Sequence, residues 1–99
     1  MPGSKTYYVY MLASARNGTL YIGVTSNLVR RVTQHRTGQC PGFTQHYHVH
    51  RLVYFEMFHH IDDAIRREKR LKKWKRQWKL RLVEQTNPDW RDLYDELVG

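Results

Sequence analysis

The chain is poor in cysteine and has no long apolar segment, and each shortage excludes a class of protein. Cys40 is the only cysteine among 99 residues, so an intramolecular disulfide and a zinc site built from several thiolates are excluded. No apolar run approaches the roughly 20 residues that span a membrane, and residues 1–5 lack the apolar segment of a secretory signal. We therefore expect a cytoplasmic protein that does not cross a membrane.

Acidic residues are few as well, since nine of them stand against 17 lysines and arginines and the net charge is +8. Ten of the 17 basic residues lie between Arg66 and Arg81, where Glu68 is the only acid. Such a concentration of charge is typical of a surface that binds nucleic-acid phosphates; a solvated helix face and contact with an acidic membrane are the alternatives. We call these ten residues the basic stripe: Arg66, Arg67, Lys69, Arg70, Lys72, Lys73, Lys75, Arg76, Lys79 and Arg81.

The N-terminal part of the chain predicts an antiparallel hairpin. Residues 7–12 are aromatic and β-branched, residues 19–24 alternate in polarity, and Asn17-Gly18 between them is typical of a tight turn. If that turn has two central residues, alternation places Val9, Met11, Leu20, Ile22 and Val24 on one face. The opposite face then receives Tyr8, Tyr10, Tyr21 and Gly23.

The rest of the chain predicts helices around one further strand. A helix is expected over residues 28–36, with capping side chains at 25–27 and a stop near Gly38. Asn27, Arg31 and His35 would line one edge of it. Residues 38–48 are typical of a loop, and residues 51–58 of a strand.

A long helical region, in one piece or two, is expected to begin with Asp62 as N-cap and to reach about Glu84. Within it, Glu68 falls in the apolar stripe and should point toward the protein body. Asn87-Pro88 would open a last turn or short helix, with Asn87 as its cap. These elements predict the α+β class: one domain over residues 1–99 in which helices flank a small, three-stranded antiparallel sheet.

Several side chains have the chemistry that phosphodiester hydrolysis requires, namely an activated water and neutralisation of charge in the transition state. Tyr10 and Tyr21 are candidates for positioning or deprotonating water, Arg31 for binding a phosphate oxygen, and Glu68 for holding a divalent cation. Because a free phenol has a pKa near 10, a tyrosine base would need a nearby cation.

The order of these residues resembles that of the GIY-YIG endonucleases, which include homing endonucleases and the incision domain of bacterial excision repair. Tyr8-Val9-Tyr10 stands for the first motif and Tyr21-Ile22-Gly23 for the second, and the family's single metal-binding glutamate corresponds to Glu68 within Arg67-Glu68-Lys69. Further matches are Asn27, Arg31, His35 and Asn87. The resemblance covers about residues 6–93, between a short N-terminal end and an acidic C-terminal end, and looks closest to short stand-alone bacterial members.

The resemblance implies a metal-dependent endonuclease that cuts DNA, with a structure-specific role in repair or recombination as a further expectation. Tyr21 would be the general base, Tyr10 would support water or phosphate, and Arg31 would stabilise the transition state. His35 would assist proton transfer or phosphate binding, Asn87 would hydrogen-bond in the site, and Glu68 would coordinate one Mg²⁺ or Mn²⁺. The implied nucleic-acid surface consists of Asn27, Arg67, Lys69, Arg70, Lys72, Lys73, Lys75, Arg76 and Lys79.

Two positions depart from the family pattern: Tyr8 replaces the usual first glycine, and Val24 stands where the repair enzymes carry a lysine. The sequence therefore leaves open a catalytically weak or inactive nucleic-acid-binding module on the same fold. It also leaves open RNA as the substrate. A homodimer or a targeting partner is a further possibility, with the acidic segment 89–96 docking on a neighbour's basic helix.

Two other metal sites compete with Glu68. One is a zinc site built on His46, His48 and His50, with Cys40 or His59 nearby. The other is a site on Glu56, in the expected third strand.

Overall fold

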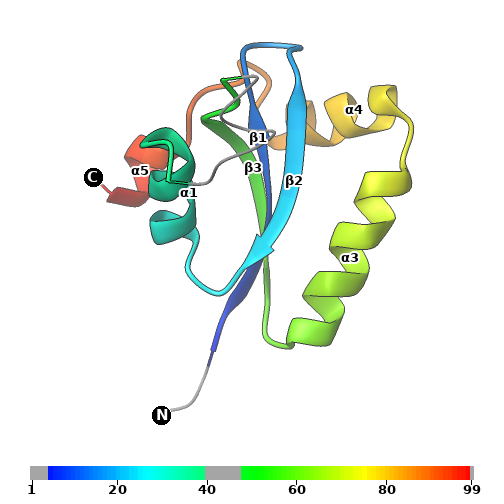
Figure 1. The fold of residues 1–99 in the computed structure, drawn as a ribbon. Helices are drawn as coiled ribbons and strands as arrows, with labels where there is room; N and C mark the ends of the chain where they lie inside the picture. The colour runs from blue at the N-terminus through cyan, green and yellow to red at the C-terminus, as the bar shows by residue number, and fades with distance from the viewer. Residues whose placement is uncertain (1–4, 40–47, 99) are drawn as a thin grey trace.

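A computed structural model describes residues 5–39 and 48–98, and it contains one antiparallel sheet and several helices (Figure 1). The sheet has the order β2-β1-β3, so β1 is central and β2 is an edge strand. The α+β prediction, with a small three-stranded sheet flanked by helices, is confirmed. The elements are β1 (Tyr7–Ala13), β2 (Leu20–Thr25), α1 (Leu28–Arg36), β3 (Arg51–Phe58), α3 (Ile61–Lys73), α4 (Arg76–Thr86) and α5 (Tyr94–Val98).

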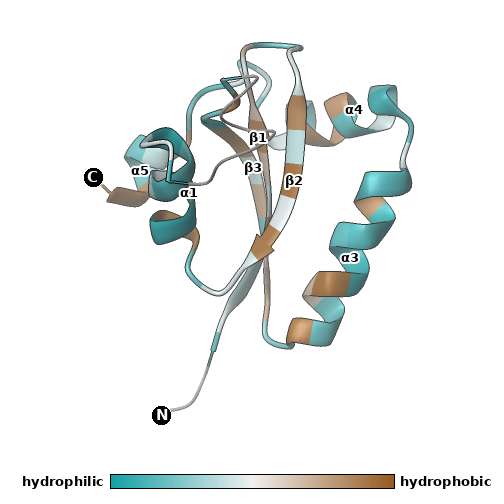
Figure 2. Cartoon of the chain, viewed as in Figure 1, coloured by the Kyte–Doolittle hydropathy of each residue, from teal (hydrophilic) through white to brown (hydrophobic). Residues whose placement is uncertain are grey.

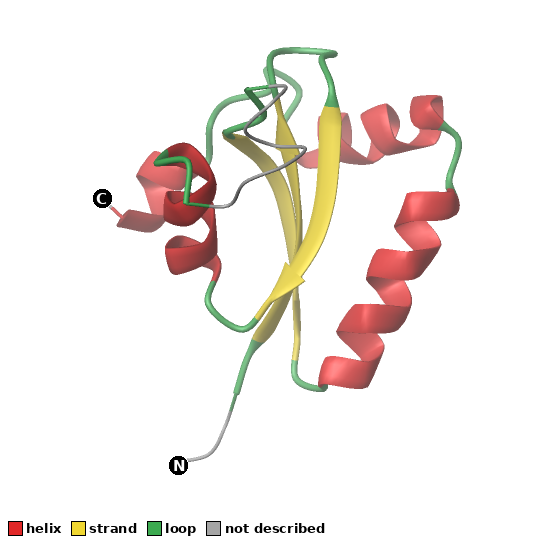
Figure 3. Cartoon of the chain, in the orientation of Figure 1, coloured by secondary structure: helices red, strands yellow, loops and turns green. Residues whose placement is uncertain are grey.

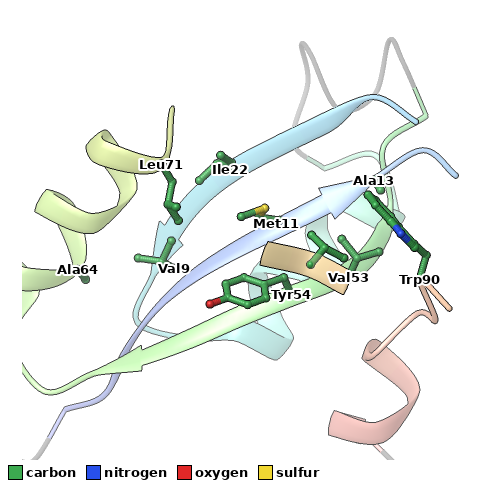
Figure 4. Close-up of a cluster of buried hydrophobic side chains, with 10 residues drawn as sticks. Val9, Met11, Ala13, Ile22, Val53, Tyr54, Ala64, Leu71 and Trp90 are labelled. Carbon is green, nitrogen blue, oxygen red and sulfur yellow. The ribbon is translucent and has the colours of Figure 1, made fainter. Parts of the chain in front are cut away.

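The helices cover both faces of the sheet. Figure 3 shows α1 and α5 on one side of the strands and α3 and α4 on the other. The core beneath α3 and α4 consists of Val9, Met11, Ala13, Ile22, Val53, Tyr54, Ala64, Leu71, Val83 and Trp90 (Figure 4). The core beneath α1 and α5 consists of Tyr10, Leu12, Leu28, Val32, Val49 and Leu52.

Hydropathy follows this layered arrangement. Figure 2 shows apolar and polar residues alternating along β2 and a mainly hydrophilic α3. Among the described residues, no helix is long and apolar enough to cross a bilayer.

The β1–β2 hairpin has the predicted faces but a longer turn. Gly18 N donates to Ala15 O at 2.9 Å and Ser14 N donates to Thr19 O at 3.0 Å, so four residues, 15–18, lie between the last bonded pair instead of two. Because side chains alternate with a period of two, a loop longer by two residues leaves every residue on its expected face. Tyr10 accordingly lies opposite Gly23.

The first helix begins and ends at the predicted residues, 28 and 36. Asn27 is its N-cap, since the Asn27 Oδ1 atom accepts from Arg30 N at 3.1 Å. After the helix, Gly38 has a φ of 78°, a left-handed conformation that a glycine adopts without strain. Local capping chemistry was therefore sufficient to define this element.

The second helical region has nearly the predicted extent, in two pieces, and differs from the prediction in its caps. It is broken into α3 and α4, because Trp74 and Lys75 are extended, with ψ of 149° and 147°. His60 is the N-cap of α3, so the cap assigned to Asp62 is wrong; Asp62 lies in the first turn, where its charge favours the positive end of the helix. Asn87 ends α4 as C-cap and does not begin a new helix.

Asn87 binds backbone groups only. Its Nδ2 donates to Val53 O at 3.1 Å and to Arg91 O at 2.9 Å, and its Oδ1 accepts from Arg91 N at 3.0 Å. The residue is 1% exposed, so these bonds are shielded from water. Asn87 therefore fixes the chain after α4 against β3.

We predict that Asn87→Ala lowers the free energy of unfolding by about 1–3 kcal/mol, because it leaves the buried backbone oxygen of Val53 unpaired and removes two part-buried bonds to Arg91. Gln85→Ala, on the exposed surface of α4, is the control and should change stability by less than about 0.5 kcal/mol. Urea denaturation of both variants measures the difference. Equal stabilities would contradict a structural role for Asn87.

Gly23 gives the ring of Tyr10 its space. A Cβ atom at position 23 would lie 2.5 Å from the Tyr10 hydroxyl oxygen and 2.6 Å from Cζ, which is closer than atoms can approach. The glycine of the motif Tyr21-Ile22-Gly23 thus has a steric role, because only glycine leaves room for Tyr10 on the neighbouring strand.

We expect Gly23→Ala to destabilise the protein by about 1–3 kcal/mol through overpacking. The penalty should largely disappear when Tyr10→Leu removes the ring, so a double-mutant cycle by thermal or chemical unfolding isolates the contact. Additive effects of the two substitutions would show that the strain arises elsewhere.

Candidate active site

Three side chains of the predicted site lie together on the α1 face of the sheet. The Tyr10 hydroxyl and His35 Nε2 are 3.1 Å apart and share a hydrogen bond. The ring of Tyr21 lies 5.2 Å from that of His35 and 6.2 Å from that of Tyr10, measured between centroids. β1, β2 and α1 therefore each contribute one member of a compact cluster, which we call the Tyr-Tyr-His cluster.

Burial within this cluster controls the protonation of His35. Burial, the positive charge of Arg31 and the proximity of His50 all lower the pKa of His35. The imidazole is therefore neutral at pH 7 and carries one proton on its two ring nitrogens. A neutral ring bonded to a phenol can accept a proton, which is the chemistry needed beside an attacking water.

Arg31 and Asn27 lie at the start of α1, beside the cluster. Arg31 is exposed and lines a polar pocket of about 260 Å³. Asn27 borders the same pocket, but its side-chain oxygen already caps the helix. Arg30 and Gln34 line it too; sequence reasoning missed them, although each lies three residues after a recognised site residue and so shares its helix edge.

Glu68 lies on α3, which packs against β1 and β2 on the side of the sheet opposite α1. Its side chain is 14% exposed, as its place in the apolar stripe predicts, and it pairs with Lys72 at 2.7 Å. Lys72 in turn lines a pocket of about 290 Å³ together with Tyr21 of β2. The predicted metal ligand, Glu68, therefore pairs with a lysine that lines the same pocket as the predicted general base, Tyr21.

Most of the basic stripe is exposed along α3 and α4, but Arg67 and Lys79 are half-buried, and Arg76 is exposed yet bound to the backbone. Arg67 turns inward, and its Nε and NH2 atoms both donate to the Glu56 carboxylate at 2.9 Å. Arg76 donates to the backbone oxygens of Asn17 and Gly18 at 2.6 and 2.7 Å, which ties α4 to the hairpin turn. These two guanidinium groups are already used within the fold.

The competing carboxylate, Glu56, is held in an internal network. Besides Arg67, it accepts a short hydrogen bond from the Tyr54 hydroxyl. Burial alone would raise the pKa of Glu56, but the hydrogen bonds from Arg67 and Tyr54 outweigh it and lower that pKa. A carboxylate that is occupied by two donors is a poor candidate for binding a metal.

The histidine alternative has no support among residues 5–39 and 48–98. His48 and His50 lie 6.0 Å apart between ring centroids, but no group of three histidine, cysteine or acidic side chains in these ranges is arranged to hold a metal. His46 and Cys40 lie outside the described residues.

The acidic segment is paired within its own chain. Asp92 binds Arg36, and Glu96 binds Arg91. Two of the four acids in segment 89–96, the segment expected to dock on a neighbour, therefore already have basic partners. Asn87 also stays apart from the Tyr-Tyr-His cluster, because its side-chain hydrogen bonds go to backbone groups.

Comparisons with known proteins agree with this arrangement. The sequence profile of the GIY-YIG catalytic domain matches residues 6–81. A UPF0213 protein of Staphylococcus haemolyticus is 35% identical over 79 residues, which are 80% of this chain and 95% of that protein. A UPF0213 protein of Pediococcus pentosaceus is 37% identical over 78 residues, which are 79% of this chain and 81% of that protein.

A solved structure is similar as well. The solution NMR structure of a UPF0213 protein from Bacillus halodurans aligns with a TM-score of 0.55 and 29% identity, covering 88% of this chain and 92% of that one. Because the profile spans more than half of the residues and includes both tyrosine motifs, α1 and Glu68, the chain belongs to the GIY-YIG catalytic domain family.

Proposed function

We propose that this protein is a divalent-metal-dependent endonuclease that hydrolyses phosphodiester bonds in DNA. The observation that supports the proposal is the Tyr-Tyr-His cluster, together with Glu68, whose partner Lys72 lines a pocket with Tyr21. A fold stabilised only by packing has no need for a hydrogen-bonded tyrosine and a neutral histidine beside a polar pocket.

In the proposed reaction, a water oxygen attacks phosphorus and the bond from phosphorus to the 3′ oxygen breaks. Tyr21 is placed to take the water proton, and the neutral imidazole of His35 is the nearby base that can hold it. Tyr10 orients His35 through their shared hydrogen bond. The leaving 3′ oxygen gains a proton from solvent, which restores neutrality at the alcohol.

Negative charge that develops on the phosphate needs a cation close to the cluster. Arg31 supplies a fixed guanidinium, one helical turn before His35 on α1. Arginine suits this role because its planar donors match two phosphate oxygens at once.

Glu68 fits the binding of one hard divalent cation. Mg²⁺ keeps most of its waters and is usually held by one or two carboxylates together with substrate phosphates, so a single half-buried glutamate is a sufficient protein ligand. Lys72 would have to leave Glu68 and could then contact the phosphate. The cation would supply charge neutralisation at the leaving oxygen.

The exposed part of the basic stripe is the proposed DNA contact. Lys69, Arg70, Lys73 and Lys75 are exposed on α3 and at its junction with α4. Arg67 is not part of this proposed DNA contact, because its guanidinium is bound to Glu56. The second candidate is a protein that binds nucleic acid without cutting it. The basic stripe fits both candidates, whereas the Tyr-Tyr-His cluster favours the enzyme.

We predict that wild-type protein nicks supercoiled plasmid or cuts branched and flapped DNA with Mg²⁺ or Mn²⁺ and not with EDTA. Tyr21→Phe and Glu68→Gln should each lower the cleavage rate by at least about 100-fold while DNA binding persists. The matched controls are Tyr7→Phe, on the opposite face of the sheet, and Asp62→Asn, at the exposed start of α3.

Tight binding without cleavage of any DNA or RNA by wild-type protein would replace the enzyme with the binding module. Cleavage that survives both substitutions would reject the assigned residues.

The rate of cleavage should fall on the acidic side of neutrality, because the proposed base His35 must be neutral. Because burial lowers the pKa of His35, the midpoint of this decline should lie below that of a free imidazole. A pH profile of kcat/KM measures this limb. An acidic decline in kcat/KM with its midpoint at pH 7 or above would contradict buried His35 as the group that titrates.

A further inference from the structure

Trp78 stands out on the surface of the basic helices. It is 46% exposed on α4, although tryptophan is among the residues most buried on average. The proposed hydrolysis of the phosphodiester bond does not use this side chain. An exposed aromatic ring within a strongly basic surface is the combination that binds unpaired nucleotides, since the ring stacks on a base while the cations meet phosphates.

The ring belongs to a defined pocket. Trp74, Trp78, Arg81, Leu82 and Gln85 enclose about 260 Å³, which is below the range of about 300–1,000 Å³ that is usual for small-molecule sites. The volume suits one ring system more than a buried cofactor. We call this site the tryptophan pocket.

The tryptophan pocket is held in shape by the internal network of Glu56. The guanidinium of Arg67 lies over the Trp74 ring, 5.2 Å from its centroid, and is itself bound by Glu56. The Trp78 ring stands nearly perpendicular to Trp74, at 83° with centroids 6.1 Å apart. One wall is therefore fixed before any ligand arrives, which lowers the entropic cost of binding.

The polar groups of this pocket are not used by the fold. In the described part of the chain, the side chains of Arg81, Gln85 and Trp78 make no hydrogen bond to another residue. An amide and a guanidinium beside an apolar floor of Leu82 offer the donors and the acceptor that the edge of a base requires.

We propose that the tryptophan pocket binds one unpaired nucleobase of the nucleic-acid substrate, so that the enzyme prefers DNA with a single-stranded segment beside a duplex. This inference rests on the proposed function. A base within a duplex is stacked on both faces and cannot enter the pocket, whereas a base in a flap or overhang is available. No acidic residue lines the pocket, which favours a polyanion over a basic peptide.

The test compares two fluorescent DNA hairpins of the same duplex sequence, one blunt and one with a short 3′ thymidine overhang. Binding is measured by anisotropy in EDTA, so that no DNA is cut. We expect Trp78→Ala to weaken binding of the overhang DNA by about 5- to 100-fold and to leave the blunt DNA unchanged. Trp78→Phe should retain most of the affinity, and Gln77→Ala, the exposed neighbour, is the matched control.

Tryptophan fluorescence gives a second readout. The overhang DNA should quench the emission of wild-type protein, and an overhang of abasic residues should not, because stacking requires a base. The buried Trp90 contributes a constant background.

An equal effect of Trp78→Ala on both DNAs, or no effect on either, would overturn the inference while wild-type binding and cleavage leave the proposed function in place. A change from dimer to monomer in Trp78→Ala by gel filtration would assign the pocket to self-association and overturn it as well. Failure of wild-type protein to bind either DNA would overturn the proposed function itself.

Discussion

The close contact of Tyr10 with Gly23 is the constraint on which the arrangement of the site depends. The missing side chain at Gly23 lets the Tyr10 ring lie across the neighbouring strand, and from there its hydroxyl meets His35 on α1. Leu28 and Val32, on the same helix, are buried against this face of the sheet, so the position of His35 is fixed by packing and by a hydrogen bond together. The second tyrosine motif thus contributes Tyr21, the proposed reacting group, and Gly23, which leaves space for the Tyr10 ring.

A second interaction organises the opposite face. The ion pair of Glu56 and Arg67 joins β3 to α3, and the same guanidinium holds Trp74 at the end of that helix. This contact fixes the orientation of α3, and with it the turn of helix that presents Glu68 to Lys72 beside β2. The sheet therefore separates two cores, and edge strand β2, which carries Tyr21, is in contact with α3.

Local patterns predicted the elements and failed where distant residues meet. Alternation identified all three strands and the faces of Tyr10 and Gly23, and capping chemistry identified α1. Nothing local reveals that Arg67 turns away from the basic stripe, because its partner Glu56 lies on another element. Asn87 opens the predicted turn, since Trp90 N donates to Asn87 O at 3.0 Å, but nothing local reveals that its side-chain amide binds the backbone of β3. The roles of the site residues come from resemblance to a family, and the fold adds the proximity on which those roles depend.

The most direct test of the account is to locate the metal with Mn²⁺ by paramagnetic broadening of backbone amide signals in solution. If Glu68 holds the metal, broadening should be strongest around Glu68, Lys72 and Tyr21. The variant Glu68→Gln should abolish the broadening and leave the rest of the spectrum unchanged. Broadening centred on Glu56, or on His48 and His50, would contradict Glu68 as the metal ligand.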